Sequence, residues 1–395
     1  MQEQTSSNNL GENVPRLRFS GFEEEWVCER LSDFTERVTR KNTNNKVKLP
    51  LTISSKAGLV DQISYFNKTV ASIDMSGYYL LKNGEYAYNK SYSVGYAFGS
   101  IKRLDQYSIG ALSTLYICFS LKKHNSDFIK IYFDSLKWYH EINIIAAEGA
   151  RNHGLLNIPT EDFFRTKHWL PININEQKKI AKFFNLLEYR IELQQKMLEA
   201  LKLYKRGALS KLFPQKGEIV PRYRFNGFTD DWKQRKLGEV CNYYSSNLSV
   251  SDIDKNGKFE LYDANGVIGK TNRLLQKEEY ITIIKDGNGV GRVRKTHKNS
   301  SFIGTMGAIV PNGLDINYLF VEFQRKDFSK HINGATIPHI YFSNYSEDIL
   351  CVPEFSEQQQ IGEYFRNLDC LITLHQSTLN SFKTIKNGLL QNLFI

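Results

Sequence analysis

The most constraining feature of the sequence is an internal repeat, because a chain that repeats its edges builds the same frame twice. Residues 15–31 read PRLRFSGFEEEWVCERL and residues 221–237 read PRYRFNGFTDDWKQRKL, with eight identities in seventeen positions at an offset of 206. A second repeat, at an offset of 181, relates residues 176–213, which begin EQKKIAKFF, to residues 357–394, which begin EQQQIGEYF. The chain is a tandem duplication whose edges repeat while its middles barely do. This pattern predicts one scaffold that carries two different heads.

The two closing segments predict long helices with a heptad seam, since apolar residues recur at spacings of three and four. Thirty-eight residues in each would span about 57 Å at the rise of an α-helix. Polar residues interrupt both seams at the same two places, Gln194 and Lys205 in the first, His375 and Lys386 in the second. A polar seam position costs stability but can fix the register of a coiled coil. The predicted seam comprises Phe184, Leu187, Ile191, Leu198 and Leu201, and Phe365, Leu368, Ile372, Leu379 and Phe382.

A helix of this kind cannot bury its apolar stripe alone, and one chain supplies two of them. Pairing as an antiparallel coiled coil is the simplest arrangement, and it would place the heads at the ends of a rod. Two independent amphipathic helices, each packed on its own domain, remain the alternative. Short alternating runs of Tyr, Ile, Val and Phe between Gly and Asn turns predict heads with twisted sheets. The expected fold class is therefore α/β (α+β), a pseudo-twofold tandem repeat.

The repeats also predict the domain boundaries. Within the heads, residues 127–141 and 317–330 are expected to be helical. The domains expected are a flexible N-terminus (1–13), head 1 (14–175), a first conserved helix (176–213), head 2 (214–352) and a second conserved helix (353–395).

Composition narrows the class of partner. The formal net charge of +10 and the pI of about 9.1 favour a polyanion such as nucleic acid, because Lys and Arg neutralise phosphates. The five cysteines form no CxxC pair, which indicates reduced thiols and argues against structural zinc. The polar first residues are not those of a signal peptide, and no apolar stretch is long enough for a membrane span. A cytoplasmic protein is expected.

Catalytic signatures are missing from the sequence, including HExxH, GxSxG and the Asn/Asp-Pro-Pro-aromatic motif of amino-methyltransferases. Gly269-Lys270-Thr271 resembles the end of a phosphate loop, but Ala264 stands where that loop needs glycine. Residues 286–292, DGNGVGR, have the spacing GxGxG rather than the dinucleotide-binding GxGxxG. They fit a loop near a backbone phosphate better than a cofactor site, although a plain hairpin remains open. We expect no enzyme activity, metal or cofactor in this chain.

The PRxRFxGFxxxW openings, the two variable middles and the repeated EQxxI helices resemble the specificity subunits of type I restriction-modification enzymes, over residues 14–395. The resemblance implies two target-recognition domains that each read one half of a bipartite, asymmetric site on double-stranded DNA. It also implies that the coiled coil sets the spacing and docks two modification (methyltransferase) subunits, beside two restriction/translocase subunits. S-adenosylmethionine, ATP and Mg²⁺ would belong to those partners.

No DNA contact carries over from the resemblance, so we select polar and basic side chains near glycine turns. Two readings compete with this one: a stand-alone enzyme with an unrecognised site, and a coiled-coil adaptor that binds RNA or protein. Arg16, Arg18 and Trp26, repeated as Arg222, Arg224 and Trp232, are expected to be scaffold, because they recur in heads whose targets differ. The candidate DNA-binding residues are Asn89, Lys90, Ser91, Tyr92, Arg151, Asn152 and His153 in head 1, and Lys285, Asn288, Arg292, Arg294, Lys295, Thr336 and His339 in head 2.

Overall fold

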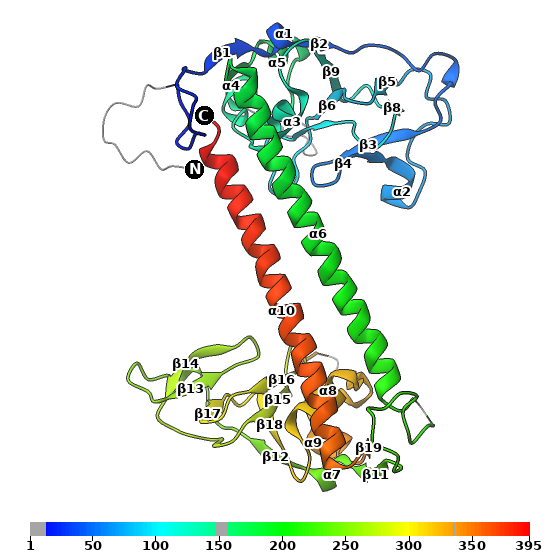
Figure 1. Cartoon of the computed structure of the whole chain (residues 1–395), viewed down its shortest axis with the longest axis vertical. Helices are drawn as coiled ribbons and strands as arrows, with labels where there is room; N and C mark the ends of the chain where they lie inside the picture. Colours follow the sequence, from blue (N-terminus) through cyan, green and yellow to red (C-terminus); the bar gives the residue numbers. More distant parts are fainter. Residues whose placement is uncertain (1–12, 147–155, 216, 335) are drawn as a thin grey trace. The chain divides into compact units, whose positions relative to one another are not determined.

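A computed structural model describes residues 13–146, 156–215, 217–334 and 336–395. The chain forms two compact units, unit 1 from Met1–Leu193 with Leu379–Ile395, and unit 2 from Gln194–Thr378. Each unit holds one head together with a segment of each long helix (Figure 1). The two helices therefore pair with each other rather than packing each on its own domain.

Head 1 is built on two four-stranded sheets of order β2-β9-β6-β7 and β4-β3-β8-β5, with a two-stranded sheet β1-β10. The small sheet joins the start of the head to the strand before the first long helix. The elements are β1 (Val27–Arg30), α1 (Leu31–Phe34), β2 (Thr35–Arg37), β3 (Pro50–Ser54), β4 (Gly58–Asp61), α2 (Gln62–Phe66), β5 (Tyr79–Lys82), β6 (Tyr86–Asn89), β7 (Ser100–Arg103), β8 (Ile109–Leu112), β9 (Ile117–Leu121), α3 (Ser126–Asp134), α4 (Tyr139–Ile145), α5 (Thr160–Arg165), β10 (Lys167–Leu170) and the long helix α6 (Ile174–Leu212).

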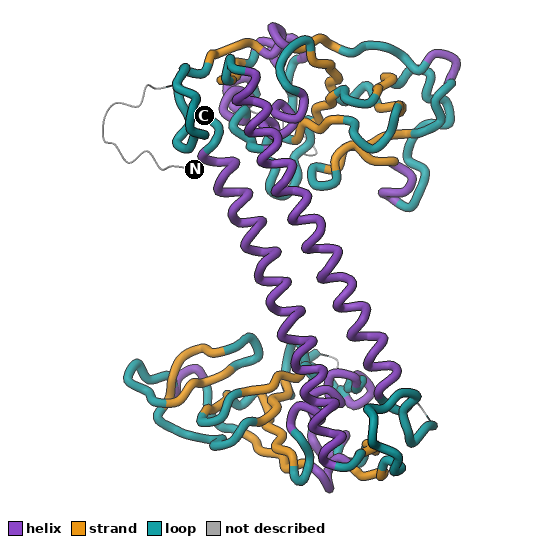
Figure 2. The backbone as a smooth tube through the Cα atoms, in the orientation of Figure 1, coloured by secondary structure: helices purple, strands orange, loops and turns teal. Residues whose placement is uncertain are grey.

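Head 2 repeats part of this plan. Its sheet β12-β18-β15-β16 and its pair β11-β19 match β2-β9-β6-β7 and β1-β10 in order, and its third sheet is β14-β13-β17. Figure 2 shows the strands in orange and the helices in purple. The elements are β11 (Lys233–Lys236), α7 (Leu237–Val240), β12 (Cys241–Ser245), β13 (Phe259–Tyr262), β14 (Val267–Thr271), β15 (Tyr280–Ile284), β16 (Val293–Thr296), β17 (Ser300–Phe302), β18 (Met306–Pro311), α8 (Ile316–Arg325), α9 (Phe342–Tyr345), β19 (Ile349–Val352) and the long helix α10 (Phe355–Asn392).

The two helices predicted inside the heads are shorter than expected. Residues 127–141 divide into α3 and α4, because Leu136 takes a left-handed φ of 61° and interrupts the helix. Residues 317–330 stop being α-helical after Arg325, since Lys326 is extended. The Asp327 side chain then accepts the amide of Ser329 and closes a separate turn. Local turn chemistry therefore overrode the apolar periodicity at both sites.

A buried carboxylate at the start of each long helix binds the first segment of its head, which we call the opening (residues 15–31 in head 1 and 221–237 in head 2). In unit 1, Arg18 donates from Nε and Nη2 to the two Glu176 oxygens at 2.7 and 2.8 Å, and the Trp26 indole reaches the same carboxylate at 3.4 Å. Glu176 is 1% exposed. A bidentate pair of this kind satisfies a buried charge and fixes its direction. Arg18 and Trp26 of the opening therefore have a structural role, as the repetition of these residues in head 2 predicted.

Unit 2 builds the same contact from the repeat-equivalent residues. Arg224 donates to the two oxygens of Glu357 at 2.9 and 2.6 Å, and the Trp232 indole donates to Glu357 at 3.1 Å. Hydrogen bonding to this carboxylate raises the pKa of Arg224. We call each Arg–Glu–Trp set a frame clasp.

The residue after each clasp glutamate fastens the helix to the rest of its head. The Gln177 side chain accepts the amide of Asn125, the N-cap of α3, and donates to the carbonyl of Pro171, both at 2.8 Å. Gln358 makes the corresponding contacts with Asp315, the N-cap of α8, and with Pro353 at 2.9 Å. Both glutamines are buried. The EQ pair thus sets the position of a head helix as well as that of the opening.

The end of each long helix completes the unit that belongs to the other half of the chain. In unit 1, Phe394 packs against Trp26 and Phe184 with ring centroids 6.2 Å apart in both pairs. In unit 2, Phe213 packs against Trp232 at 6.1 Å and Phe365 at 5.9 Å. Because each aromatic core takes side chains from both halves, neither half is a self-contained domain.

The polar interruptions of the seams are paired across the helices. Lys205 binds Asp369 at 2.6 Å in unit 2, and the repeat-equivalent Lys386 binds Glu188 in unit 1. The amide of Gln194 donates to a ring nitrogen of His375 at 2.7 Å. Since these partners fit in one antiparallel register, they specify it. Of the predicted seam residues, the buried ones are Phe184, Ile191, Leu198, Phe365, Leu368 and Leu379, and the half-buried ones are Leu187, Leu201, Ile372 and Phe382.

Loss of a clasp carboxylate should be far more costly than loss of an exposed one. We expect Glu357→Ala to lower the free energy of unfolding by about 3–5 kcal/mol, because the half-buried Arg224 and the buried Trp232 would lose the acceptor that they share. The control is Glu363→Ala on the same helix, whose exposed pair with Arg366 is worth about 0.5 kcal/mol or less. Chemical denaturation measures both, and equal losses would contradict a structural role for the clasp.

A buried histidine gives unit 1 an expected sensitivity to acid. His168 is fully enclosed between the Tyr132 hydroxyl and the Thr166 hydroxyl, each 2.9 Å from a ring nitrogen. Burial lowers its pKa to about 3 from an ordinary 6.5. Below pH 6.5 this histidine is protonated in the unfolded chain, whereas in the folded chain it stays neutral down to about pH 3. Stability should therefore fall with pH between about 6.5 and 3, by up to about 1.4 kcal/mol per pH unit from this residue.

Leucine occupies the equivalent strand position in head 2, Leu350, which makes His168→Leu the natural test. The variant leaves the buried Tyr132 hydroxyl without its hydrogen-bond partner, so it should be less stable than the wild type at pH 7.5. Its unfolding free energy should nevertheless fall less steeply between pH 6.5 and 4.5. The exposed His140→Leu serves as the control and should keep the wild-type slope. An unchanged slope in His168→Leu would refute the assignment.

Candidate nucleic-acid interface

A glycine-rich loop of head 2 follows the buried strand β15. Gly287, Gly289 and Gly291 all have left-handed φ angles, between 85° and 89°. A Cβ on Gly291 would lie 2.9 Å from the Cβ of Phe328. The sequence therefore needs glycine here for backbone conformation and for close packing, not for a dinucleotide. This turn exposes the side chain of Asn288.

The second predicted loop of head 2 lies against the first. The amide of Gly287 donates to the carbonyl of Pro338 at 2.9 Å, and the amide of Ile340 donates to that of Lys285 at 2.8 Å. Asn333 and His339 exchange backbone hydrogen bonds at 2.8 Å and close the second loop on itself. The structure thus brings two separately chosen segments into one surface, which we call the head 2 loop pair (residues 285–292, 333–334 and 336–341).

Exposed side chains of several kinds cover the head 2 loop pair. Thr336 is exposed, and the half-buried His339 packs its ring against Tyr341 with centroids 5.1 Å apart. Ile337 and Tyr341 are 66% and 55% exposed. Sequence reasoning missed both, although apolar residues within a polar loop are a usable signal. Such a mixture offers donors, acceptors and apolar contacts, the groups that distinguish base edges.

The basic residues of head 2 differ in what holds them. Arg292 is exposed, and its guanidinium donates to the carbonyl of Ala264. Arg294 reaches the same carbonyl at 3.5 Å. Lys295 is held by Asn317 at 2.7 Å and Glu279 at 3.0 Å, so its geometry is that of a structural residue. Lys285 is only 3.8 Å from the carboxylate of Asp286. Arg292 is therefore the cation of this set best placed for a phosphate or a base.

The candidate residues of head 1 lie at the end of β6. The Asn89 side chain accepts the amide of Ser91 at 3.0 Å and shapes the turn, and Tyr92 is 59% exposed. The Lys90 carbonyl accepts the amide of Leu156 at 3.0 Å, and partial burial lowers the pKa of its ammonium. The turn at residues 89–92 is therefore hydrogen-bonded to Leu156, which lies shortly after the second predicted segment. That segment, Arg151, Asn152 and His153, lies outside the described residues.

Head 1 also carries an exposed apolar patch that sequence reasoning missed. Tyr65 and Phe66 of α2 are 51% and 44% exposed and pack edge to face with centroids 5.0 Å apart. Ile73, on the loop that follows, is 95% exposed. The signal in the sequence was the run ISYF before a polar stretch.

Metal and membrane sites were also sought. Over residues 13–146, 156–215, 217–334 and 336–395, no group of three or more His, Cys, Asp or Glu side chains is arranged to hold a metal ion. Within the same ranges no helix has the length and apolarity of a membrane span.

Comparison with known proteins gives one family. Residues 229–383 match the model of the type I restriction modification DNA specificity domain. A putative type I specificity subunit of Mycoplasma genitalium is 24% identical over 233 residues, which cover 56% of this chain and 60% of that protein. The specificity subunit of the type I restriction enzyme MjaVIII of Methanocaldococcus jannaschii is 21% identical over 277 residues, 62% of this chain and 65% of its own. The chain thus matches somewhat less than two thirds of the length of these relatives.

Solved structures show the same fold over nearly the whole chain. The S subunit of a type I restriction-modification system from M. genitalium has a TM-score of 0.64 at 16% identity and covers 97% of this chain and 99% of its own. A chain from a structure of type I restriction-modification complex assembly and conformational transition has a TM-score of 0.54 at 15% identity, with 93% and 97% covered. The predicted fold class is confirmed.

Proposed function

This chain belongs to the family of type I restriction-modification specificity subunits, and on that premise we propose that it supplies the DNA sequence specificity of such a complex. Each head would read one half of a bipartite, asymmetric site. One observation carries the proposal: two clasps of the same residues hold two heads whose exposed loops differ. Specificity requires contacts to base edges, which differ between targets, whereas the supporting scaffold can stay constant.

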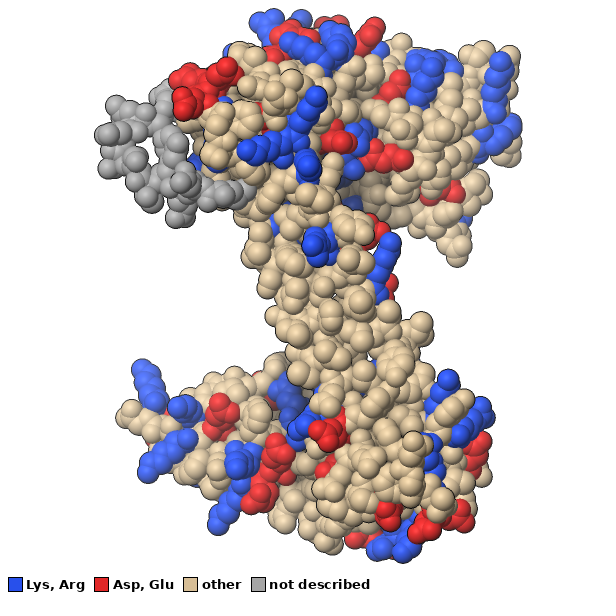
Figure 3. Space-filling view, in the orientation of Figure 1, with Lys and Arg blue, Asp and Glu red and all other residues tan. Residues whose placement is uncertain are grey.

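We further propose that the long helices dock methyltransferase subunits. Large apolar side chains lie exposed on α6 and α10 outside the seam, and Leu193 and Leu374, which are repeat equivalents, are 46% and 60% exposed. On the face seen in Figure 3, Lys and Arg lie mostly over the heads and few lie over the helices. Apolar stripes of this kind suit partner helices. Two modification and two restriction/translocase subunits would then bring S-adenosylmethionine, ATP and Mg²⁺ to a non-catalytic chain, in the cytoplasm.

The decisive experiment is single-molecule sequencing of DNA methylation in a host that expresses this chain with its methyltransferase subunit. We expect methyladenine in one split, asymmetric motif, and loss of that methylation when the chain is deleted. The matched control deletes the methyltransferase subunit and keeps the chain. Methylation that survives deletion of this chain would refute the proposal and favour an RNA- or protein-binding adaptor.

Substitution of the exposed guanidinium of the head 2 loop pair tests the interface itself. We expect Arg292→Ala to weaken binding to the cognate duplex by roughly 5- to 150-fold, the equivalent of about 1–3 kcal/mol, and to relax preference in one half-site only. Arg235→Ala, on the exposed frame strand β11, is the control and should bind as the wild type does. Competition binding with duplexes altered in either half-site measures both effects. If affinity and preference are unchanged, Arg292 does not touch the DNA.

A further inference from the structure

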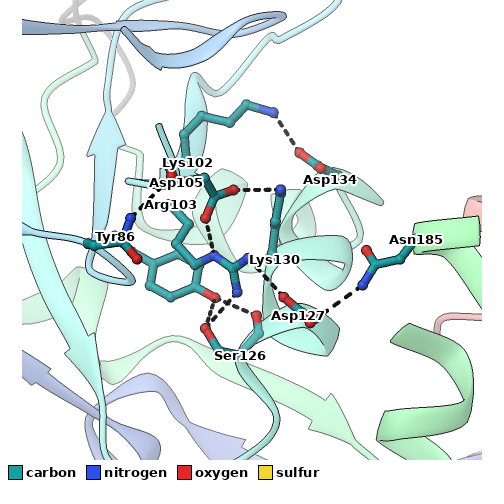
Figure 4. Close-up of polar contacts among 10 residues, drawn as sticks. Tyr86, Lys102, Arg103, Asp105, Ser126, Asp127, Lys130, Asp134 and Asn185 are labelled. Carbon is teal, nitrogen blue, oxygen red and sulfur yellow. Dashed lines mark hydrogen bonds and ion pairs between the residues drawn. The ribbon is translucent and has the colours of Figure 1, made fainter. Parts of the chain in front are cut away.

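Unit 1 contains a polar cleft that none of the candidate interface residues lines. It measures about 530 Å³ and lies between the β3–β4 turn, the end of β7, α3 and the two long helices. Five Lys or Arg and three Asp or Glu line it. Figure 4 shows how the side chains of β7 and α3 converge there. The lining therefore carries an excess of positive charge in a recess large enough for a phosphate group and its sugar.

Carboxylates hold the cations of this cleft in fixed positions. Asp105 binds both Arg103 and Lys130 at 2.6 Å, and Asp134 binds Lys102 at 2.6 Å. Arg103 also binds Asp127 at 2.8 Å, so each of these three cations has a carboxylate partner. Lys130 is 41% exposed at the rim, and among the described residues the exposed Lys56, on the β3–β4 turn, forms no ion pair.

Helix α10 contributes a further ammonium group, that of Lys386, to the lining of the cleft. Lys386 pairs with Glu188 of α6 and is only 25% exposed. Burial lowers its pKa, and the charges of Lys102 and Lys130 lower it further, while Asp134 acts in the opposite direction. Three ammonium groups, those of Lys102, Lys130 and Lys386, thus lie near one another, although each has a carboxylate partner of its own. Like charges repel one another, so a further anion in the recess would be favourable.

Unit 2 shows that helix pairing does not require a lysine at the position of Lys130. Lys205, the repeat equivalent of Lys386, binds Asp369 at 2.6 Å and the neutral Gln324 at 2.8 Å. Gln324 stands where unit 1 has Asp134, and Phe320 stands where it has Lys130. The same interhelical ion pair is therefore made without a cation in the place of Lys130, so helix pairing does not account for Lys130.

We propose that this cleft binds a phosphate group of the DNA backbone, with Lys56 and Lys130 at its rim and Lys386 at its floor. The proposal rests on the function proposed above and adds a contact that reads no sequence. A tetrahedral phosphate can accept hydrogen bonds from several ammonium donors at once, and its charge balances the excess of the lining. Head 1 then contacts the backbone of duplex DNA near the helices as well as reading its bases.

Salt dependence distinguishes a phosphate contact from a structural ion pair. The full chain, assembled with its methyltransferase subunits, is titrated with a duplex of random sequence over a series of salt concentrations. The slope of log K against log [salt] falls by about 0.9 for each phosphate that the protein no longer neutralises. We expect this fall for Lys130→Gln and for Lys386→Gln, with several-fold weaker binding at low salt. Lys386→Arg should keep the slope.

The matched control is Lys205→Gln, which removes the equivalent interhelical pair from unit 2 and should keep the wild-type slope. Equal slopes for Lys386→Gln and Lys205→Gln, or no change in Lys130→Gln, would overturn the inference. Lys130 lies at the rim, so its variant remains informative if Lys386→Gln folds poorly. A wild-type complex that binds no duplex would instead refute the proposed function. Wild-type binding with unchanged variant slopes would refute only the cleft.

Discussion

Each unit depends on one buried carboxylate, Glu176 or Glu357, at the first turn of a long helix. An ionised carboxylate inside a protein is tolerated only when its oxygens are fully hydrogen-bonded. Here the bidentate arginine and the indole of the opening supply those bonds. The adjacent glutamine extends the same constraint to the N-cap of a head helix. Three segments far apart in sequence are thereby fixed around one charge, and the loops above them are free to vary.

The seam between the helices follows the same logic of polar specification. Apolar residues give the pairing its strength, but an apolar stripe alone tolerates slippage. The lysine pairs and the Gln194–His375 contact have partners in only one register. Because the lysine pairs are repeat equivalents, the duplication supplied the register marker twice. A charged residue that occurs in only one unit is not needed for the scaffold that both units share. Lys130, in the cleft of unit 1, is such a residue.

Much of this architecture was predictable because it follows from short sequence patterns, namely the heptad spacing and the two repeats. The heptad seam gave the long helices to within a few residues, and the repeats gave the frame residues, with Arg18 and Trp26 correctly assigned to the scaffold. Their common partner was not predictable, since nothing in the sequence links Arg18 to Glu176 across 158 positions. The break at Leu136 escaped notice because a left-handed leucine carries no sequence signal. The predicted family is confirmed, whereas the DNA contacts of the loops remain a prediction, because loop surfaces depend on tertiary pairing.

The exchange of helix ends has a consequence for biosynthesis. Head 1 emerges first from the ribosome, yet its core stays open until Phe394 arrives to cover Trp26. Unit 2 needs nothing beyond Thr378, so it can close before the unit that precedes it in the chain. A prematurely terminated product would leave the aromatic pocket of unit 1 exposed to proteases and chaperones.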